Sequence, residues 1–261
     1  MSLITVMTYN IQLGAGSDSM PRYIVDWLSV SLARPHSAKN IETIIENIKT
    51  ISPDILAVTE SEGVSARNQF MNYNELIQNG AFRGNNDFGR YASFQCHYHS
   101  TKSGVTKKNQ YNAIFAKPEH EISAESSMDF TNSEQRRSIG RADIKIKTGD
   151  SYLPISAFVT HLSVAEKYHK KQVEEVLEFA EEGDGLKFIT GDFNVKGDDS
   201  VLNPLREKYQ EVGPYNTWPS WGTPKDPLDR MFVSKEFGIL RSAVPIFKGS
   251  DHLPLVATLE Y

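Results

Sequence analysis

The sequence GDFN, residues 191–194, places a carboxylate and an amide two positions apart at the end of an apolar run. In an extended chain Asp192 and Asn194 share one side, while Phe193 between them turns away into packing. Gly191 is expected to let the backbone turn close to a substrate. GDFN therefore predicts two chemically useful side chains at the end of a buried strand.

Polar residues follow other β-rich runs of the chain in the same way. Taken singly, each would more often be a turn former, a cap or a structural hydrogen-bonding group. Their recurrence favours a single site, because side chains at neighbouring strand ends converge on one rim of a sheet. The candidates are Asn10, Glu60, His161, Asp192, Asn194, Asp229, Asp251 and His252.

These residue types permit phosphoester hydrolysis. Oxygen ligands from Asn10, Glu60 and the GDFN pair suit a hard cation such as Mg²⁺. Two histidines beside acids can move protons, and Asp229 or Asp251 can orient an imidazole ring. A divalent cation that polarises a phosphoryl oxygen, with water as the nucleophile, hydrolyses a phosphoester.

Composition and missing motifs narrow the alternatives. The sequence has no thiolate cluster and no HExxH motif, which argues against a zinc site. It has no GxxxxGK[ST] loop, which argues against nucleotide-triphosphate transfer, and no GxSxG elbow, which argues against a serine hydrolase. A formal net charge of −5 argues against a processive nucleic-acid binder of high affinity. One cysteine, Cys96, and no membrane-spanning apolar run are typical of a cytoplasmic protein. Secretion through a leader outside this sequence remains an alternative.

The elements that must position these residues are many strands and a few helices, and from residue 90 onward most of them are strands. Two segments share a plan, since each has a helix leading into a strand that ends in an acid, Glu60 or Asp192. Ser37 is the expected N-cap of the first of these helices. The expected helices cover residues 38–50, 66–79 and 166–182, and the expected strands cover 3–10, 54–59, 91–97, 111–117, 141–147, 151–161, 186–190, 229–234, 239–246 and 254–260. No linker divides the chain, so residues 1–261 are expected to form one α/β domain with two packed sheets and helices outside.

The ordered motifs of the chain resemble a known family. They are TYNIQ, PDILAVTE, YNAIFAK, VTHL, GDFN, LDRMFVS and SDHLPLVATL, running from residue 8 to residue 259. In this order they resemble the endonuclease/exonuclease/phosphatase superfamily, in its histidine-bearing branch. The resemblance implies an α+β four-layer sandwich, with two packed mixed β-sheets flanked by helices. It also implies cleavage of phosphate esters that depends on Mg²⁺, with Mn²⁺ as the alternative.

The resemblance also implies a role for each acidic and histidine residue of the motifs. Glu60 would be the main metal ligand with Asn10 beside it, and Asp251 would help to hold a metal. His161 would contact or protonate the scissile phosphate group. Asp192 would position or activate the attacking water. Asn194 would hold a phosphate oxygen, and Asp229 would orient His252, while the choice between Asp192 and His252 as the base stays open.

Three further residues are candidates for substrate binding. Asn112 matches a phosphate-side asparagine of the resembled family. Arg136 is either a bidentate phosphate contact or a solvated strand start. Trp221, which shares the sequence TWPSWGTP with Trp218, is either a stacking platform for a base or an anchor of its loop. The lysines of residues 102–108, with Arg136 and Arg137, are a local basic feature that would attract a polyanion.

The sequence therefore predicts a monomeric phosphoester hydrolase, first of all a phosphodiesterase or nuclease acting on nucleic acid or another diester. A phosphomonoesterase or lipid-headgroup phosphatase on the same site is the second hypothesis. A catalytically inactive binding scaffold is the third, and it is disfavoured because every acidic and histidine position of the motifs is retained.

Overall fold

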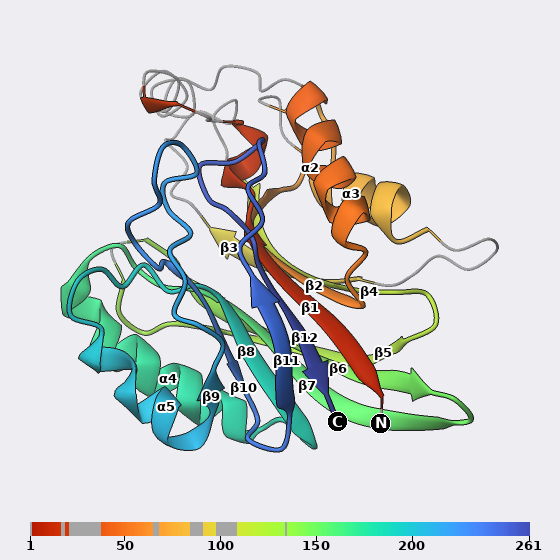
Figure 1. Ribbon diagram of the computed structural model, residues 1–261. Coiled ribbons are helices and arrows are strands. Elements are labelled where there is room, and N and C mark those ends of the chain that lie inside the picture. The colour runs from red at the N-terminus through yellow and green to blue at the C-terminus, as the bar shows by residue number, and fades with distance from the viewer. Residues whose placement is uncertain are drawn as a thin grey trace.

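Two six-stranded mixed β-sheets lie against each other in the computed structural model, with helices on their outer faces (Figure 1). The structure describes residues 2–16, 19–20, 38–64, 68–83, 91–97, 109–133 and 135–261. The four layers of helices, sheet, sheet and helices confirm the α/β sandwich expected from the sequence.

The first sheet has the strand order β11-β12-β1-β2-β4-β3. Its centre is formed by β1 and β2, which run parallel, and every other neighbouring pair is antiparallel. The strands are β1 (Leu3–Asn10), β2 (Ile55–Glu62), β3 (Tyr91–His97), β4 (Asn109–Ala116), β11 (Gly238–Ala243) and β12 (Leu255–Glu260).

The second sheet has the strand order β5-β6-β7-β8-β10-β9. Here β7 and β8 form the parallel pair at the centre. The strands are β5 (Glu121–Asp129), β6 (Ser138–Thr148), β7 (Ser151–His161), β8 (Leu186–Asp192), β9 (Gln210–Glu211) and β10 (Asp229–Val233).

Each parallel pair is joined by a crossover helix. The helix α2 (Ala38–Ile51) connects β1 to β2, and α4 (His169–Glu181) connects β7 to β8. The shared plan that the sequence indicated is thus confirmed in both sheets. Two shorter helices, α3 (Tyr73–Ala81) and α5 (Asn203–Lys208), lie beside them in the outer layers. None of the helices in the described ranges has the length and apolar character needed to cross a membrane.

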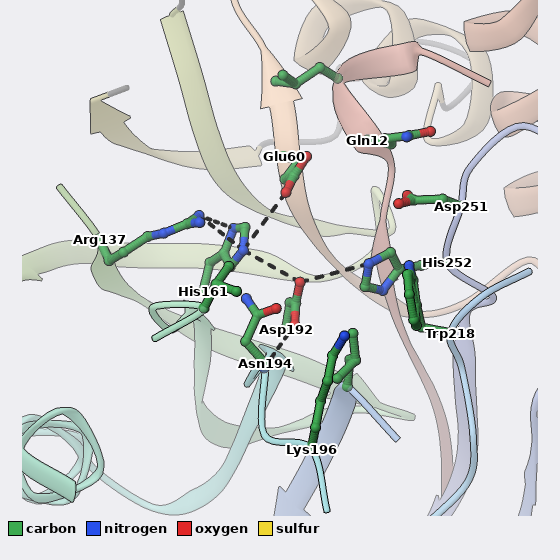
Figure 2. A pocket seen from close by; sticks show the side chains of 13 residues that line it. Gln12, Glu60, Arg137, His161, Asp192, Asn194, Lys196, Trp218, Asp251 and His252 are labelled. Atoms are coloured by element: carbon green, nitrogen blue, oxygen red, sulfur yellow. Dashed lines mark hydrogen bonds and ion pairs between the residues drawn. The ribbon is translucent and has the colours of Figure 1, made fainter. Parts of the chain in front are cut away.

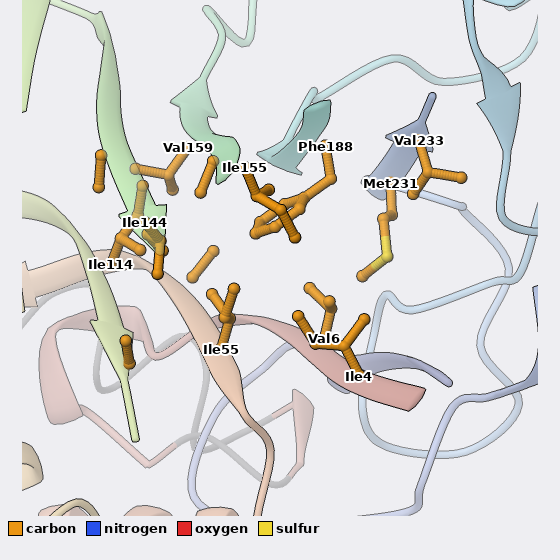
Figure 3. Close-up of a cluster of buried hydrophobic side chains, with 14 of the residues drawn as sticks. Ile4, Val6, Ile55, Ile114, Ile144, Ile155, Val159, Phe188, Met231 and Val233 are labelled. Atoms are coloured by element: carbon orange, nitrogen blue, oxygen red, sulfur yellow. The ribbon is translucent and has the colours of Figure 1, made fainter. Parts of the chain in front are cut away.

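The main core fills the space between the sheets (Figure 3). Ile4 and Val6 of the first sheet face Met231 and Val233 of the second, and Phe188 packs among them. The remaining faces of the sheets are covered by the helices. In a strand that is buried on both faces, a shift by one residue would move every side chain to the opposite face of the sheet and so into the other hydrophobic core. Packing on both faces therefore fixes the register that places the polar strand ends.

Several elements differ from the sequence prediction. The strand β5 was not predicted because it is an edge strand with mostly exposed side chains, which gives little apolar signal. The helix expected from residue 66 begins only at Tyr73, where the Asn72 side chain accepts a hydrogen bond from Asn74 N. Gln69 and Phe70 before it have left-handed backbone, with φ of 57° and 61°. The short elements α5 and β9 were also missed, and Ser37 lies outside the described residues.

Candidate active site

Strand register brings three candidate residues of the second sheet into one row. The parallel pairing of β7 with β8 sets His161 beside Asp192, and the antiparallel pairing of β10 with β8 sets Asp229 on the other side of Asp192. In the first sheet Asn10 is paired with Thr59, next to Glu60. Polar ends of both sheets therefore meet at one rim.

A cavity of about 270 Å³ opens at this rim (Figure 2). Six of the residues predicted from the sequence line it: Glu60, His161, Asp192, Asn194, Asp251 and His252. Two further candidates support the cavity from behind. Asn10 donates from Nδ2 to Asp192 Oδ2 at 2.9 Å, and Asp229 contacts His252.

The backbone is strained at four positions that line the cavity, namely Leu13 and three polar residues. Gln12, Glu60 and Asn194 have φ of 48°, 55° and 53°, a left-handed conformation that costs free energy for residues other than glycine. At Glu60 this coincides with an irregularity of β2 between Val58 and Ser61, where the pairing with β4 shifts register. A bulge of this kind re-aims a side chain, and here the side chain is Glu60, which lines the cavity.

The GDFN turn is held by its own hydrogen bonds. Asn194 N donates to Asp192 Oδ1 at 2.9 Å, and Asn194 Nδ2 donates to Leu162 O at 3.1 Å. Asp192 and Asn194 both reach the cavity, but the left-handed turn at Asn194 produces this, rather than an extended chain. Phe193 points into the core against Phe232, as expected, with ring centroids 5.5 Å apart.

Gly191 serves the packing of strands. Its φ is +135°, and a Cβ at this position would lie 2.0 Å from the carbonyl oxygen of Thr160. Thr160 is its neighbour across the β7–β8 pairing. The structure therefore assigns the glycine to a close approach between two strands, where the sequence suggested a close approach to a substrate.

His252 forms a dyad with Asp229. The His252 Nδ1 and Asp229 Oδ2 atoms are 2.8 Å apart, and His252 Nε2 lies 3.9 Å from Asp192 Oδ2. Burial alone would lower the pKa of His252, but the negative charges of Asp229, Asp251 and Asp192 raise it well above the ordinary value. The surrounding carboxylates therefore favour the imidazolium form of His252.

His161 has the opposite protonation state. Burial and then the positive charges of Arg137 and His252 lower its pKa well below the ordinary value. Arg137 Nη1 lies 2.8 Å from Nδ1 and 2.9 Å from Nε2 of His161. His161 Nε2 is also 3.4 Å from Asp192 Oδ2. The site thus holds one neutral and one charged histidine on either side of Asp192.

Carboxylates are crowded in the cavity. Burial, together with the charges of Asp229 and Glu60, raises the pKa of Asp192 to about 7 against the lowering effect of His252. Burial raises the pKa of Asp251 to about 6, with a smaller contribution from Glu60.

This donor set fits a divalent cation. One donor atom from each of Glu60, His161 and Asp192 lies within 4.8 Å of the others. A bound cation would offset the negative charge that adds to the effect of burial on the carboxyl pKa values.

Comparison with known proteins identifies the family to which the chain belongs. The model described as the Endonuclease/Exonuclease/phosphatase family matches residues 7–252, nearly the whole chain. The chain belongs to this family. Members of the endonuclease/exonuclease/phosphatase family are phosphoester hydrolases. No curated protein matches the sequence.

Solved structures of the endonuclease/exonuclease/phosphatase family share the fold at low sequence identity. An endonuclease/exonuclease/phosphatase from Beutenbergia cavernae has a TM-score of 0.73 and 18% identity, over 99% of this chain and 71% of that chain. The mannosyl-6-phosphatase Bt3783 of Bacteroides thetaiotaomicron has a TM-score of 0.68 and 17% identity, over 99% and 100%. The human Nocturnin catalytic domain with bound sulfate has a TM-score of 0.69 and 16% identity, over 99% and 93%.

Three predicted substrate contacts of this family member do not line the cavity. Arg136 bonds to Asp129 at the surface, since its Nε lies 2.7 Å from Asp129 Oδ2. Asn112 is fully buried, and its Nδ2 donates to Ser138 O at 3.4 Å. Trp221 packs edge-to-face against Trp218, with ring centroids 6.3 Å apart. These three side chains are therefore not among the residues that line the cavity, and their contact with substrate stays a prediction.

The cavity also has polar and aromatic residues that were not among the predicted site residues. Arg137, Trp218, Lys196 and Gln12 all line the cavity. Arg136 and Arg137 are adjacent, so in extended chain they point to opposite sides, and the sequence does not show which side is the cavity. The predicted lysines of residues 102–108 lie outside the described residues.

Proposed function

We propose that this chain is a divalent-metal-dependent phosphoester hydrolase, and more specifically a phosphodiesterase that uses water as the nucleophile. The observation that carries this proposal is the position of Asp192 between a neutral and a charged histidine. His161 Nε2 lies 3.4 Å and His252 Nε2 lies 3.9 Å from Asp192 Oδ2. A carboxylate between two such groups is placed to handle the protons of a water molecule next to a phosphate group.

Glu60 and Asp251 would hold the cation, with Asn10 beside them. Their carboxylates are close enough for the charge of Glu60 to raise the pKa of Asp251. His161 is a poorer ligand, because a neutral imidazole has one nitrogen lone pair and the Arg137 guanidinium is placed to donate to it. When bound, Mg²⁺ or Mn²⁺ would polarise a phosphoryl oxygen and offset the charge of the cavity.

Asp192 is the proposed general base. The dyad with Asp229 favours the imidazolium form of His252, which has no lone pair to accept a proton. The pKa of Asp192 is about 7, and a cation nearby would lower it and keep the carboxylate ionised. Asn10 orients Asp192 through the 2.9 Å hydrogen bond. The imidazolium of His252 would then stabilise the negative charge that develops on the phosphoryl group.

His161 and Asn194 are proposed to bind phosphate oxygens. A neutral imidazole is a hydrogen-bond donor at one nitrogen, so His161 would contact the phosphate rather than protonate it. An asparagine amide has two N–H donors, of which Asn194 uses one for Leu162 O. Arg137, which lines the cavity beside His161, supplies a positive charge for the same group.

A phosphomonoesterase is the second candidate, and the size of the cavity favours it. About 270 Å³ suits a small phosphate ester better than a nucleic-acid duplex. The structurally similar Bacteroides protein is a mannosyl-6-phosphatase. The same residues would serve either reaction, so the two candidates differ only in the second ester bond.

Hydrolysis of bis-p-nitrophenyl phosphate and p-nitrophenyl phosphate, each with Mg²⁺ and with Mn²⁺, tests the proposal. We expect wild-type activity on the diester, and loss of that activity in Asp192→Ala and in His252→Ala. Glu178→Gln, on the exposed face of α4, is the matched control and should keep wild-type activity. Thermal melting followed by circular dichroism checks that each variant folds. If wild type hydrolyses no phosphoester, or if Asp192→Ala keeps full activity, the proposed enzymatic function is refuted.

A further inference from the structure

Lys196 is a cation at the cavity that the reaction proposed above does not use. It lies two residues after the GDFN turn and lines the same cavity as Asp192. Its Nζ lies 4.1 Å from the ring centroid of Trp218 and 3.9 Å from Asp226 Oδ2. Figure 2 shows the side chain extended along the cavity wall toward Trp218.

Both partners of Lys196 belong to one small hairpin. Trp218 and Asp226 face each other in an isolated antiparallel bridge, with Trp218 N and Asp226 O 3.1 Å apart. The Trp218 side chain also hydrogen-bonds Asp251, which fixes the indole against the cavity. The ammonium group is therefore held between a fixed aromatic face and a fixed carboxylate.

The loop that carries Lys196 is anchored at both ends. On one side the GDFN turn is closed by the Asn194 N to Asp192 Oδ1 hydrogen bond. On the other side Asp199 Oδ2 lies 2.6 Å from Arg206 Nη2 and 3.0 Å from the buried Arg230 Nη2. A lysine on such a loop loses less conformational entropy on binding a ligand than a lysine on a free surface.

The position of Lys196 changes the role of the aromatic side chains. The ammonium group lies over the face of Trp218, so that face is not open to stack on a base. The 3.9 Å separation from Asp226 is longer than a hydrogen bond, which leaves N–H groups of the ammonium for a ligand. The ligand must be an acceptor, and an anion would be favoured.

Among the described residues that line the cavity, Arg137 and Lys196 carry permanent positive charge. They lie on opposite sides of Asp192 and Asn194 in Figure 2. Arg137 contacts His161, which is the side assigned above to the phosphate that is cut. We propose that Lys196 binds a second anionic group of the substrate, so that the preferred substrate carries a second phosphate beside the scissile ester. This inference rests on the proposed function and specifies its substrate class.

Two kinds of compound supply this chemistry, namely an oligonucleotide with its neighbouring phosphate and a sugar bisphosphate. One matched pair is thymidine 5′-(p-nitrophenyl phosphate) with and without a 3′-phosphate. The other pair is a hexose 6-phosphate and the corresponding hexose 1,6-bisphosphate, and its hydrolysis is measured by the release of inorganic phosphate. The pair in which the second phosphate raises kcat/KM identifies the source.

For wild type we expect kcat/KM about tenfold higher on the doubly phosphorylated member of one pair, the size of one charge-assisted hydrogen bond. In Lys196→Gln the ratio of the two kcat/KM values, with and without the second phosphate, should fall to about 1. The control Lys171→Gln, at an exposed position of α4, should keep the wild-type ratio. Binding of thymidine 3′,5′-bisphosphate and thymidine 5′-monophosphate by calorimetry, in Asp192→Asn and Asp192→Asn/Lys196→Gln proteins, gives the same comparison without turnover.

The outcomes separate this inference from the proposed function. If wild type hydrolyses bis-p-nitrophenyl phosphate but shows no preference in either pair, the inference is wrong and the proposed function stands. The same holds if Lys196→Gln lowers both members of each pair equally, because Lys196 would then serve the phosphate that is cut. If wild type hydrolyses no phosphoester, the proposed function fails, and equal calorimetric affinities for the two nucleotides would overturn the inference as well.

Discussion

His252 and Asp229 form a 2.8 Å contact that joins the two sheets. His252 lies just before β12 of the first sheet, and Asp229 begins β10 of the second. Asn10 and Asp192 make a second link of the same kind, at 2.9 Å. The candidate site is therefore complete only when the two sheets are packed, so the apolar core between them also sets the geometry of the site.

Asp229→Asn should reduce turnover while leaving the fold intact. The substitution keeps the shape of the side chain but removes the charge that raises the pKa of His252. We expect kcat on bis-p-nitrophenyl phosphate to fall by about 10²–10⁴. The pKa of His252 should fall as well, which an NMR titration of the imidazole can follow. Asp150→Asn, in the exposed turn after β6, is the matched control. An unchanged kcat would contradict the role given to the dyad.

Gly191→Ala should destabilise the protein and impair the site together. The added Cβ would lie 2.0 Å from the Thr160 carbonyl, so β7 and β8 must move apart next to Asp192. We expect a loss of about 2–4 kcal/mol in the free energy of unfolding in urea. Gly197→Ala is the control, since its φ is also positive, at +65°, but nothing lies within 4 Å of the new Cβ. It should cost about 1 kcal/mol. Equal losses in the two variants would show that close strand packing is not the reason for the glycine.

The buried guanidinium of Arg230 depends on its carboxylate partners. Arg230 is 1% exposed, and its Nη1 lies 2.6 Å from Glu211 Oε1. Asp199, 3.0 Å from Arg230 Nη2, is the second partner, so removing Glu211 leaves the buried charge with only one carboxylate to compensate it. Glu211→Ala should therefore lower the free energy of unfolding by about 3 kcal/mol. Glu207→Ala, at an exposed position of α5, should change it by less than about 0.5 kcal/mol. A Glu211→Ala protein as stable as wild type would show that Arg230 finds other compensation.

The fold and the acidic centre of the site follow from the sequence for a physical reason. Strands buried on both faces leave continuous apolar runs, and their polar ends stand out against them. Glu60, His161 and Asp192 each end such a run, and all three line one cavity. Edge elements such as β5 carry no such contrast, because most of their side chains are exposed.

The rim of the site was harder to predict. Which of Arg136 and Arg137 faces the cavity depends on the exact residue at which β6 begins, and the structure starts this strand at Ser138 instead of residue 141. The sequence likewise does not show which of Trp218 and Trp221 lines the cavity, because the loop that carries them has no periodic pattern. Lys196 gave no signal in sequence, since its role comes from the hairpin of Trp218 and Asp226, which only the folded chain brings beside it.

The central claim is that the crowded carboxylates of this cavity hold a divalent cation for phosphoester hydrolysis. The most direct measurement is the rate of bis-p-nitrophenyl phosphate hydrolysis by wild type and Glu60→Gln, after removal of metal with EDTA and after addition of Mg²⁺ or Mn²⁺. We predict that wild type loses activity in EDTA and regains it with either ion, whereas Glu60→Gln stays inactive at the Mg²⁺ concentration that saturates wild type. Wild-type hydrolysis that continues unchanged in EDTA would contradict the account.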